Sequence, residues 1–382
     1  MRSAVILLAI PLIVAHTQQP FATDNGAIPD VTSEEWFRKY GAQPDLGFTG
    51  PLSFAHLPYT KCLEDASQPF DIAILGFPFD TTTSYRPGAR MGPRSIRAAR
   101  NSAGATLAWG KGPFDWGARL LDCGDVPLSQ YDNSKAIDQM EIAYSTLLAR
   151  PVPGETKPST AFMAKDGAEH PRIVTLGGDH TIVLPILRSL HKVYGQISVI
   201  HFDAHFDTSA VEGILGQERI SHGSYFTIAA EENLMTNHSI HAGIRQKMGG
   251  GLAVVDHDVA VGFQVISTED MDDYGLDAVV AKIRQRVGMG PVYLSLDIDT
   301  IDPGMAPATG TPEAGGWTTR EVKRILRGLS GLNFVGVDIV EVAPAFDHAE
   351  ITSLAAASIV NDLIMMMQME APPKPHVGPF GL

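Results

Sequence analysis

Short apolar runs recur along the chain from residue 71 onward, and most are followed by Gly, Asp or Pro. Continuous apolar runs of this kind are typical of strands that are buried on both faces. We expect strands at residues 71–77, 119–123, 172–176, 197–202, 239–244, 263–267, 292–296 and 334–340. Between them we expect helices, including those at residues 134–149, 181–194, 275–287 and 319–329. Strands that alternate with helices predict a single three-layer α/β/α domain with a central, mainly parallel sheet.

The two ends of the chain depart from this alternation. Residues 1–17 combine Arg2 with an apolar run that is shorter than the roughly 20 residues of a membrane span. We therefore expect a cleaved secretory signal and a secreted protein, with an uncleaved anchor or a misassigned start as the alternative. The expected organisation is then an N-terminal extension at residues 18–60, the folded domain at residues 61–372 and a loose C-terminal tail at residues 373–382.

Composition narrows the possible partners. The 382-residue chain has 29 Lys and Arg residues against 43 Asp and Glu residues, a net charge of −14. This balance argues against nucleic-acid binding and is compatible with a cationic substrate. The apolar stretch at residues 351–369 is interrupted by Asn361 and Asp362, so it predicts a buried helix. We expect no membrane partner once the signal is removed.

Two further features leave alternatives open. Cys62 and Cys123 are too few for a disulfide framework, and either one bridge between them or two free thiols would fit. The segment Asn237-His238-Ser239 is an N-glycosylation sequon. It leads directly into an apolar run, and we treat it as a chance match.

Three predicted strands run into clusters of Asp and His. The strings are Gly177-Gly178-Asp179-His180, Asp203-Ala204-His205-Phe206-Asp207 and Asp297-Ile298-Asp299. Side chains alternate in extended chain, so the alternate residues of the second and third strings should each point to one side. Because parallel strands present their carboxyl ends at one edge of the sheet, we expect the three clusters to meet there.

Such a cluster predicts a metal centre. A single Asp or His would be explained as a turn residue or a hydrogen-bonded side chain, and Asp179 alone is read in that way. Several buried carboxylates, however, repel each other unless cations lie among them. The carboxylates and imidazoles of His180, Asp203, His205, Asp207, Asp297 and Asp299 suffice for two divalent ions. Oxygen-rich, thiolate-free ligands favour manganese over zinc. Two metals that share a water predict hydrolysis, because they lower the pKa of that water.

At these residues the sequence resembles the ureohydrolases, the family of arginase, agmatinase and guanidinobutyrase. The family strings also include Arg86-Pro87-Gly88-Ala89-Arg90, His222-Gly223, Gly243-Ile244-Arg245 and Asp338-Ile339-Val340-Glu341-Val342. The resemblance covers residues 71–369 and implies an arginase-like fold, two manganese ions, and a homo-oligomer that is a trimer or a hexamer.

The resemblance also implies roles for individual residues. One metal would be held by His180, Asp203, Asp207 and Asp297, and the other by His205, Asp203, Asp297 and Asp299. Glu341 would bind the guanidinium group of the substrate. His222, on an entrance loop, would shuttle protons and contact substrate, and Asp207 would pass a proton to the leaving amine.

Within this family, agmatine is the expected substrate, with putrescine and urea as products. The loop Thr208-Ser209-Ala210 lacks the pattern with which arginases hold an α-amino acid. Guanidinobutyrase is the alternative. Glu212 or Glu218 could serve the ammonium of agmatine, and Arg219 the carboxylate of 4-guanidinobutyrate.

Some residues depart from the agmatinase pattern. Phe206 is bulky, and Ser224-Tyr225-Phe226 stands where many agmatinases have Thr-Pro-Phe. A one-zinc deacetylase of the same fold is disfavoured by His180 and by the four carboxylates. A metal-binding homologue without catalysis is a further alternative.

Overall fold

The computed structural model describes residues 38–41, 49–99, 104–153 and 163–374. The predicted signal at residues 1–17 lies outside the described residues, as do most of the predicted extension and tail. The chain divides into a unit of residues 1–45 and a unit of residues 46–382. In the first unit the described residues 38–40 are helical. The second unit contains the sheet and everything that follows.

The larger unit is built on an eight-stranded sheet in the order β2-β1-β3-β8-β7-β4-β5-β6. The strands are β1 (Ile72–Gly76), β2 (Leu120–Asp125), β3 (Arg172–Leu176), β4 (Ser198–Phe202), β5 (Ser239–Ile244), β6 (Phe263–Ser267), β7 (Val292–Asp297) and β8 (Phe334–Val340). All neighbouring strands pair in parallel. Every predicted strand is present, with bounds that differ by at most two residues.

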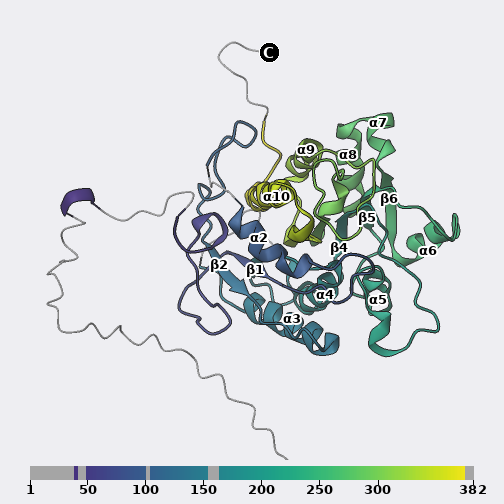
Figure 1. Ribbon diagram of the computed structural model, residues 1–382, viewed down its shortest axis with the longest axis horizontal. Helices are drawn as coiled ribbons and strands as arrows, with labels where there is room; N and C mark the ends of the chain where they lie inside the picture. Colours follow the sequence, from purple (N-terminus) through teal and green to yellow (C-terminus); the bar gives the residue numbers. More distant parts are fainter. Residues whose placement is uncertain (1–37, 42–48, 100–103, 154–162, 375–382) are drawn as a thin grey trace, which may run out of the picture. The chain divides into compact units, whose positions relative to one another are not determined.

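Helices cover both faces of the sheet (Figure 1). One face packs against α2 (Gly92–Ala98), α8 (Leu276–Val287), α9 (Thr319–Leu329) and α10 (Ile351–Gln368). The other face packs against α3 (Asn133–Leu148), α4 (Val183–Tyr194) and α5 (Tyr225–Glu231). Two further helices, α6 (Ala253–Val261) and α7 (Glu269–Tyr274), follow β5 and β6. The predicted three-layer α/β/α architecture is confirmed.

The sheet has a hydrophobic core on each face, because successive side chains of a strand point to opposite faces. Ile72 and Ile74 of β1 belong to the core under α10, whereas Ala73 and Leu75 belong to the core under α3 and α4. Because both faces are covered, apolar residues are needed at every position, and this produces the continuous apolar runs.

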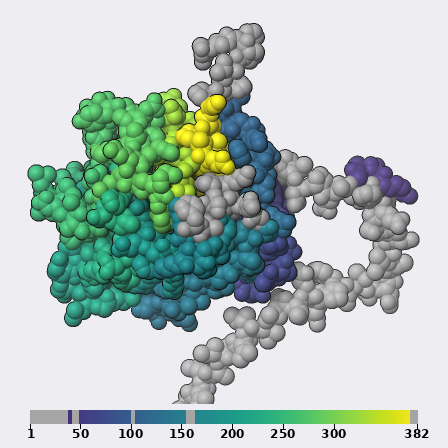
Figure 2. Space-filling view, turned by 180° about the vertical axis from the view of Figure 1, so that it is seen from behind, coloured from purple at the N-terminus to yellow at the C-terminus, as the bar shows by residue number. Residues whose placement is uncertain are grey.

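Helix α10 is the predicted buried helix. By length and composition it could cross a membrane, but 78% of that window is buried inside the protein. The space-filling view shows the end of this segment in yellow, against surfaces from the blue and green parts of the chain (Figure 2).

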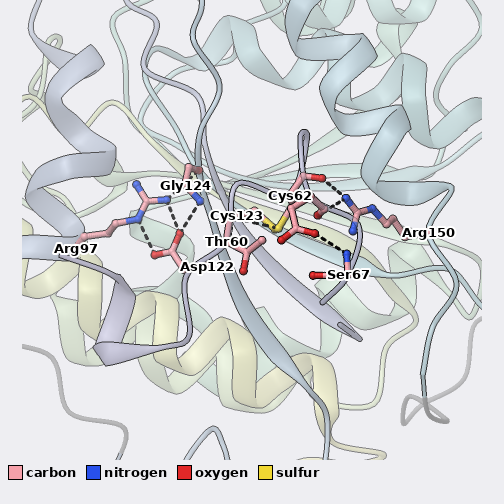
Figure 3. The surroundings of a disulfide bond; sticks show 9 residues. Thr60, Cys62, Ser67, Arg97, Asp122, Cys123, Gly124 and Arg150 are labelled. Carbon is pink, nitrogen blue, oxygen red and sulfur yellow. Dashed lines mark hydrogen bonds and ion pairs between the residues drawn. A yellow bond between two sulfur atoms is a disulfide. The ribbon is translucent and has the colours of Figure 1, made fainter. Parts of the chain in front are cut away.

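Residues 54–62 contact the edge strand β2, and Figure 3 shows Thr60 and Cys62 of this segment beside Cys123. The amide of Phe54 donates to Oδ2 of Asp122 at 2.8 Å, and Arg97 binds the same carboxylate at 2.8 Å. Cys62 and Cys123 form a disulfide, which resolves the alternative that the sequence left open. Part of the predicted extension therefore lies on the sheet, and the bridge fastens it there.

Candidate metal centre and active site

The metal-ligand candidates meet at the carboxyl ends of three central strands. His180 follows β3, Asp203 follows β4, and Asp297 ends β7. These three residues are buried, with at most 3% of their surface exposed. The structure brings all six predicted ligands together in two overlapping groups.

The first group surrounds Nδ1 of His180. This atom lies 3.0 Å from Oδ2 of Asp203, 3.1 Å from Oδ2 of Asp207 and 3.3 Å from Oδ2 of Asp297. The opposite ring nitrogen, Nε2, lies 2.7 Å from Oγ of Ser295, whose hydroxyl donates to Asp338 at 2.9 Å. The Ser295–Asp338 pair thereby orients the ring so that Nδ1 faces the carboxylates.

The second group surrounds Nδ1 of His205. This atom lies 3.1 Å from Oδ1 of Asp203 and 3.0 Å from Oδ2 of Asp299. The two oxygens of the Asp203 carboxylate thus face different histidines, Oδ2 toward His180 and Oδ1 toward His205. This is the arrangement that a carboxylate bridging two cations requires.

The ligands converge through turns, and the expectation that they alternate along extended chain was wrong. Strand β4 ends at Phe202, and Asp207 has a left-handed backbone with φ of 55°. Oδ1 of Asp203 instead accepts from the amide of His205 at 2.6 Å. Asp299 lies in a 3₁₀ turn, where its amide donates to Asp297 at 2.7 Å. Beyond the last ladder bond nothing enforces period two, so side-chain to backbone bonds set these directions.

Crowding of the carboxylates shifts several pKa values at this site. Burial and the charges of Asp299 and Asp203 raise the pKa of Asp297 well above its usual range. Burial and the charge of Asp203 raise the pKa of Asp299 to about 6. Burial disfavours the charged form of His205, but the carboxylates of Asp299 and Asp203 outweigh it and raise this pKa to about 12. At neutral pH the shifts of Asp297 and His205 favour bound protons on two donors that would otherwise bind cations.

The donor set fits two divalent cations. Nδ1 of His180 and Oδ2 of Asp203 are buried and lie 3.0 Å apart, yet neither atom forms a hydrogen bond, as expected of atoms that face a metal position. Two sets of residues each place their donor atoms within 4.8 Å of one another. The first set is His180, His201, Asp203 and Asp207, and the second is Asp203, His205 and Asp299. Imidazole nitrogens and carboxylate oxygens are donors that bind divalent metal ions.

Glu341 stands beside this centre. It follows β8 with a left-handed φ of 60°, and its amide donates to the carbonyl of Gly178 at 2.8 Å. Its carboxylate is fully buried. Oε1 accepts from the amide of His180 at 2.9 Å, whereas Oε2 has no hydrogen-bond partner. A buried carboxylate with one free oxygen is a site for a cationic ligand.

His222 contacts Glu341 across the site. Its Nδ1 lies 3.2 Å from Oε1 of Glu341, and its Nε2 lies 3.0 Å from the amide and 2.8 Å from the hydroxyl of Ser84. Burial lowers the pKa of His222, but the hydrogen bond and charge of Glu341 outweigh it and raise this pKa to about 9. The Ser84 amide suits the neutral ring and the hydroxyl suits the protonated ring, so both states are accommodated.

A cavity of about 530 Å³ leads to this group of residues. His205, Asp207, His222 and Asp297 line it together with Ser84, Phe206, Thr208, Ser209, Ala210, Gly223, Gln246, Ala253, Val254, His257 and Thr311. None of these lining residues is Lys or Arg. Three residues suggested for the substrate tail, Glu212, Glu218 and Arg219, do not line it. Arg219 instead pairs with Glu231 at 2.6 Å.

Sequence reasoning missed several polar partners. His201 lies two residues before Asp203, and its Nε2 is 2.9 Å from Oδ2 of that residue. Ser295 precedes Asp297 in the same way and binds His180. His201 lies in β4 and Ser295 in β7, where side chains do alternate, so each could have been found as the polar strand residue two positions before a ligand. The pairing of His222 with Ser84, in contrast, joins two loops and leaves no local signal.

Known proteins share this architecture and sequence. Residues 70–366 match the arginase family. The chain is 50% identical over 335 residues to "Putative agmatinase 1" of Schizosaccharomyces pombe, and this alignment covers 85% of this chain and 84% of that protein. It is 36% identical over 324 residues to guanidinobutyrase of Pseudomonas aeruginosa, covering 84% and 93%. The structure of proclavaminate amidino hydrolase from Streptomyces clavuligerus aligns with a TM-score of 0.74 at 31% identity, over 85% of this chain and 100% of that one.

Proposed function

The chain belongs to the arginase family, and we propose that it is a manganese-dependent ureohydrolase that converts agmatine and water to putrescine and urea. The observation that carries the proposal is the position of Glu341. Its buried carboxylate, with Oε2 free, lies beside a set of donors for two metals. A guanidinium ion matches that combination, because it pairs with a carboxylate and has a carbon that a metal-activated water can attack.

Three of the metal donors, His205, Asp207 and Asp297, line the cavity. One cation would be held by His180, Asp203, Asp207 and Asp297, and the other by His205, Asp203, Asp297 and Asp299. Bound there, two divalent cations would supply hydroxide at neutral pH by lowering the pKa of a shared water. Asp203 and Asp297 would lie between the two positions and fix their separation.

Glu341 binds and orients the substrate in this proposal. A planar guanidinium pairs with a carboxylate through two parallel N–H bonds, and both oxygens of Glu341 would take part. Oε1 is now 3.2 Å from His222, so the substrate replaces that contact. The guanidinium carbon is thereby held in a fixed orientation next to the metal donors.

Two residues transfer protons in this proposal. Oδ2 of Asp207 faces the centre, so this carboxylate would take a proton from the attacking water and pass it to the leaving amine. His222 exchanges protons between the centre and the cavity, because Ser84 accommodates both protonation states of its ring.

The cavity disfavours a carboxylate tail. Its lining contains no Lys or Arg, and its two carboxylates, Asp207 and Asp297, are the proposed metal ligands. The carboxylate of 4-guanidinobutyrate would enter without a cationic partner, which is costly in a partly desolvated site. The higher identity to the Schizosaccharomyces pombe protein than to guanidinobutyrase supports the same choice.

Urea release by the manganese-loaded protein tests the proposal. Agmatine, 4-guanidinobutyrate, 3-guanidinopropionate and arginine are compared at equal concentration, with Asp203→Asn as the background. Urea mainly from agmatine is the expected result. Urea mainly from 4-guanidinobutyrate would reassign the substrate. No urea from any of the four, with two metals bound, would identify a homologue without this activity.

We also propose that the protein enters the secretory pathway. The Cys62–Cys123 disulfide supports this, because such bonds persist in oxidising compartments. Asn237 of the sequon is exposed, whereas Ser239 is buried in β5, so a glycan would have to be added before β5 folds. Expression with the native N-terminus in a eukaryotic host tests the proposal. Secreted protein lacking residues 1–17 is expected, and intracellular protein with an intact N-terminus would refute it.

We propose a trimeric or hexameric homo-oligomer on the strength of the family resemblance. Light scattering of the purified protein gives its mass and would show a monomer if the proposal is wrong.

A further inference from the structure

Asp207 belongs to the first group of donors and has a left-handed backbone, with φ of 55°. Its Oδ2 lies 3.1 Å from Nδ1 of His180. A residue other than glycine adopts this conformation at a cost, and the conformation persists only where the surrounding structure holds it. On the N-terminal side, the amide of Phe206 donates to Oε1 of Gln246 at 3.1 Å. The position of the Asp207 carboxylate therefore depends on what fixes the backbone on the other side.

The next residue, Thr208, is bonded to helix α6. Its hydroxyl donates to Oδ1 of Asp258 at 2.9 Å, and both residues are buried, with at most 2% of their surface exposed. The same oxygen of Asp258 lies 2.9 Å from Nε2 of His241 in β5. Asp258 therefore connects the sheet and α6 to the loop that follows Asp207.

Other hydrogen bonds of this loop lead to different elements. The amide of Ser209 donates to the carbonyl of Gly223 on the entrance loop at 2.9 Å. The hydroxyl of Thr227 in α5 donates to the carbonyl of Ser209 at 3.0 Å. The Thr208–Asp258 bond is a separate anchor, because α6 carries none of the proposed metal ligands or catalytic residues.

Shape alone does not require this pair of side chains. Valine has nearly the shape of threonine and would fill position 208 without burying a hydroxyl. A carboxylate is costly to bury as well, and Oδ2 of Asp258 has no hydrogen-bond partner. What the pair contributes is the hydrogen bond between Thr208 and Asp258, and that bond fixes the residue next to Asp207.

We propose that Thr208 and Asp258 are positioning residues that hold the backbone at Asp207 and so keep its carboxylate toward the first cation position. The inference rests on the proposed two-metal function. The second group of donors, around His205, does not contain Asp207. Residues one step behind a ligand typically raise metal affinity by 10- to 100-fold, so loss of the Thr208 hydroxyl should weaken one of the two sites.

Thr208→Val tests the proposal, because it removes the hydroxyl and nearly preserves the shape of the side chain. Thr208→Ser keeps the hydroxyl, and the control Val261→Ala removes a buried contact of α6 without touching the hydrogen bond. Manganese affinity is measured by competition with a chelator, on protein whose fold is checked by circular dichroism. In Thr208→Val, one of the two equivalents should bind about 10- to 100-fold more weakly than in wild type. The other equivalent, and both equivalents in the other two variants, should bind as in wild type.

Three results would overturn the proposal. The first is wild-type affinity for both equivalents in Thr208→Val, and the second is an equal weakening of both. The third is the same loss in Thr208→Ser or Val261→Ala, which would mean general loosening. If Thr208→Val does not fold, Thr208→Ala replaces it, with the same selective loss expected and unchanged affinity contradicting the proposal. Wild-type protein that binds two manganese ions and releases no urea would refute the proposed reaction alone, because metal affinity is measured without substrate. Fewer than two bound ions would refute the reaction and this inference together.

Discussion

Nδ1 of His222 and Oε1 of Glu341 lie 3.2 Å apart, although 119 positions separate the two residues in the chain. The contact joins the entrance loop to the carboxyl end of β8. It also occupies the oxygen that a guanidinium group would use, so His222 must give way when substrate binds. The strength of this contact therefore affects both folding and substrate binding.

The His222–Glu341 contact predicts a pH-dependent stability of the metal-free protein. The folded state raises the pKa of His222 from 6.5 to about 9. Its stabilisation is fully present below pH 6.5 and is lost as the pH rises through about 9. In thermal unfolding, the midpoint temperature of His222→Gln should be well below that of wild type at low pH. The two midpoint temperatures should converge above pH 9. His238→Gln, at an exposed position, is the control, and a constant gap across this range would contradict the prediction.

Replacement of Glu341 by Gln should impair substrate binding without loss of metal. A charge-assisted hydrogen bond contributes roughly 1.5–3 kcal/mol, so kcat/KM for agmatine should fall about 10- to 100-fold. Metal content is measured on the same preparation and should equal that of wild type. Glu231→Gln, which removes the exposed partner of Arg219, should leave kcat/KM unchanged. A loss of bound metal in Glu341→Gln would instead place this residue among the ligands.

Asp203 should be indispensable to both metal positions. Asp203→Asn removes the charge that faces His180 and His205, so both cations should be lost together. Urea release should fall by more than about 100-fold, the upper range for residues that only support a ligand. Atomic absorption counts the bound manganese, and Asp277→Asn at the exposed Arg324 pair serves as control. Retention of one full equivalent in Asp203→Asn would argue against a bridging role.

The disulfide should support stability and leave catalysis unchanged. Cys62 and Cys123 are 61 positions apart, and closing a loop of this length stabilises a protein by about 4 kcal/mol in the chain-entropy treatment. The double change Cys62→Ser with Cys123→Ser should lower the free energy of unfolding by that order. Because β1 separates β2 from the site strands, kcat/KM of the folded variant should equal that of wild type. A reductant should reproduce the loss in wild type and add nothing in the variant, and a matching fall in kcat/KM would couple this edge to the site.

The strands and the ligands followed from local features of the sequence. Continuous apolar runs mark β3 and β4 because both faces of the sheet are covered, and the Asp and His residues come directly after those runs. Parallel pairing then brings His180, Asp203 and Asp297 to one edge whatever the details of the turns. Such inferences need only neighbours in the chain and the geometry of a sheet.

The tertiary structure decided what depends on segments that meet only in the folded chain. Only in the folded chain does Cys62 form a disulfide with Cys123, and only there does His222 contact Ser84. Arg219 likewise pairs with Glu231 and does not line the cavity. The tertiary structure also replaced strand alternation at Asp207 by a left-handed turn. Hydrogen bonds between distant loops leave no period in the sequence, since their energy depends on distances that arise only when the whole sheet has assembled.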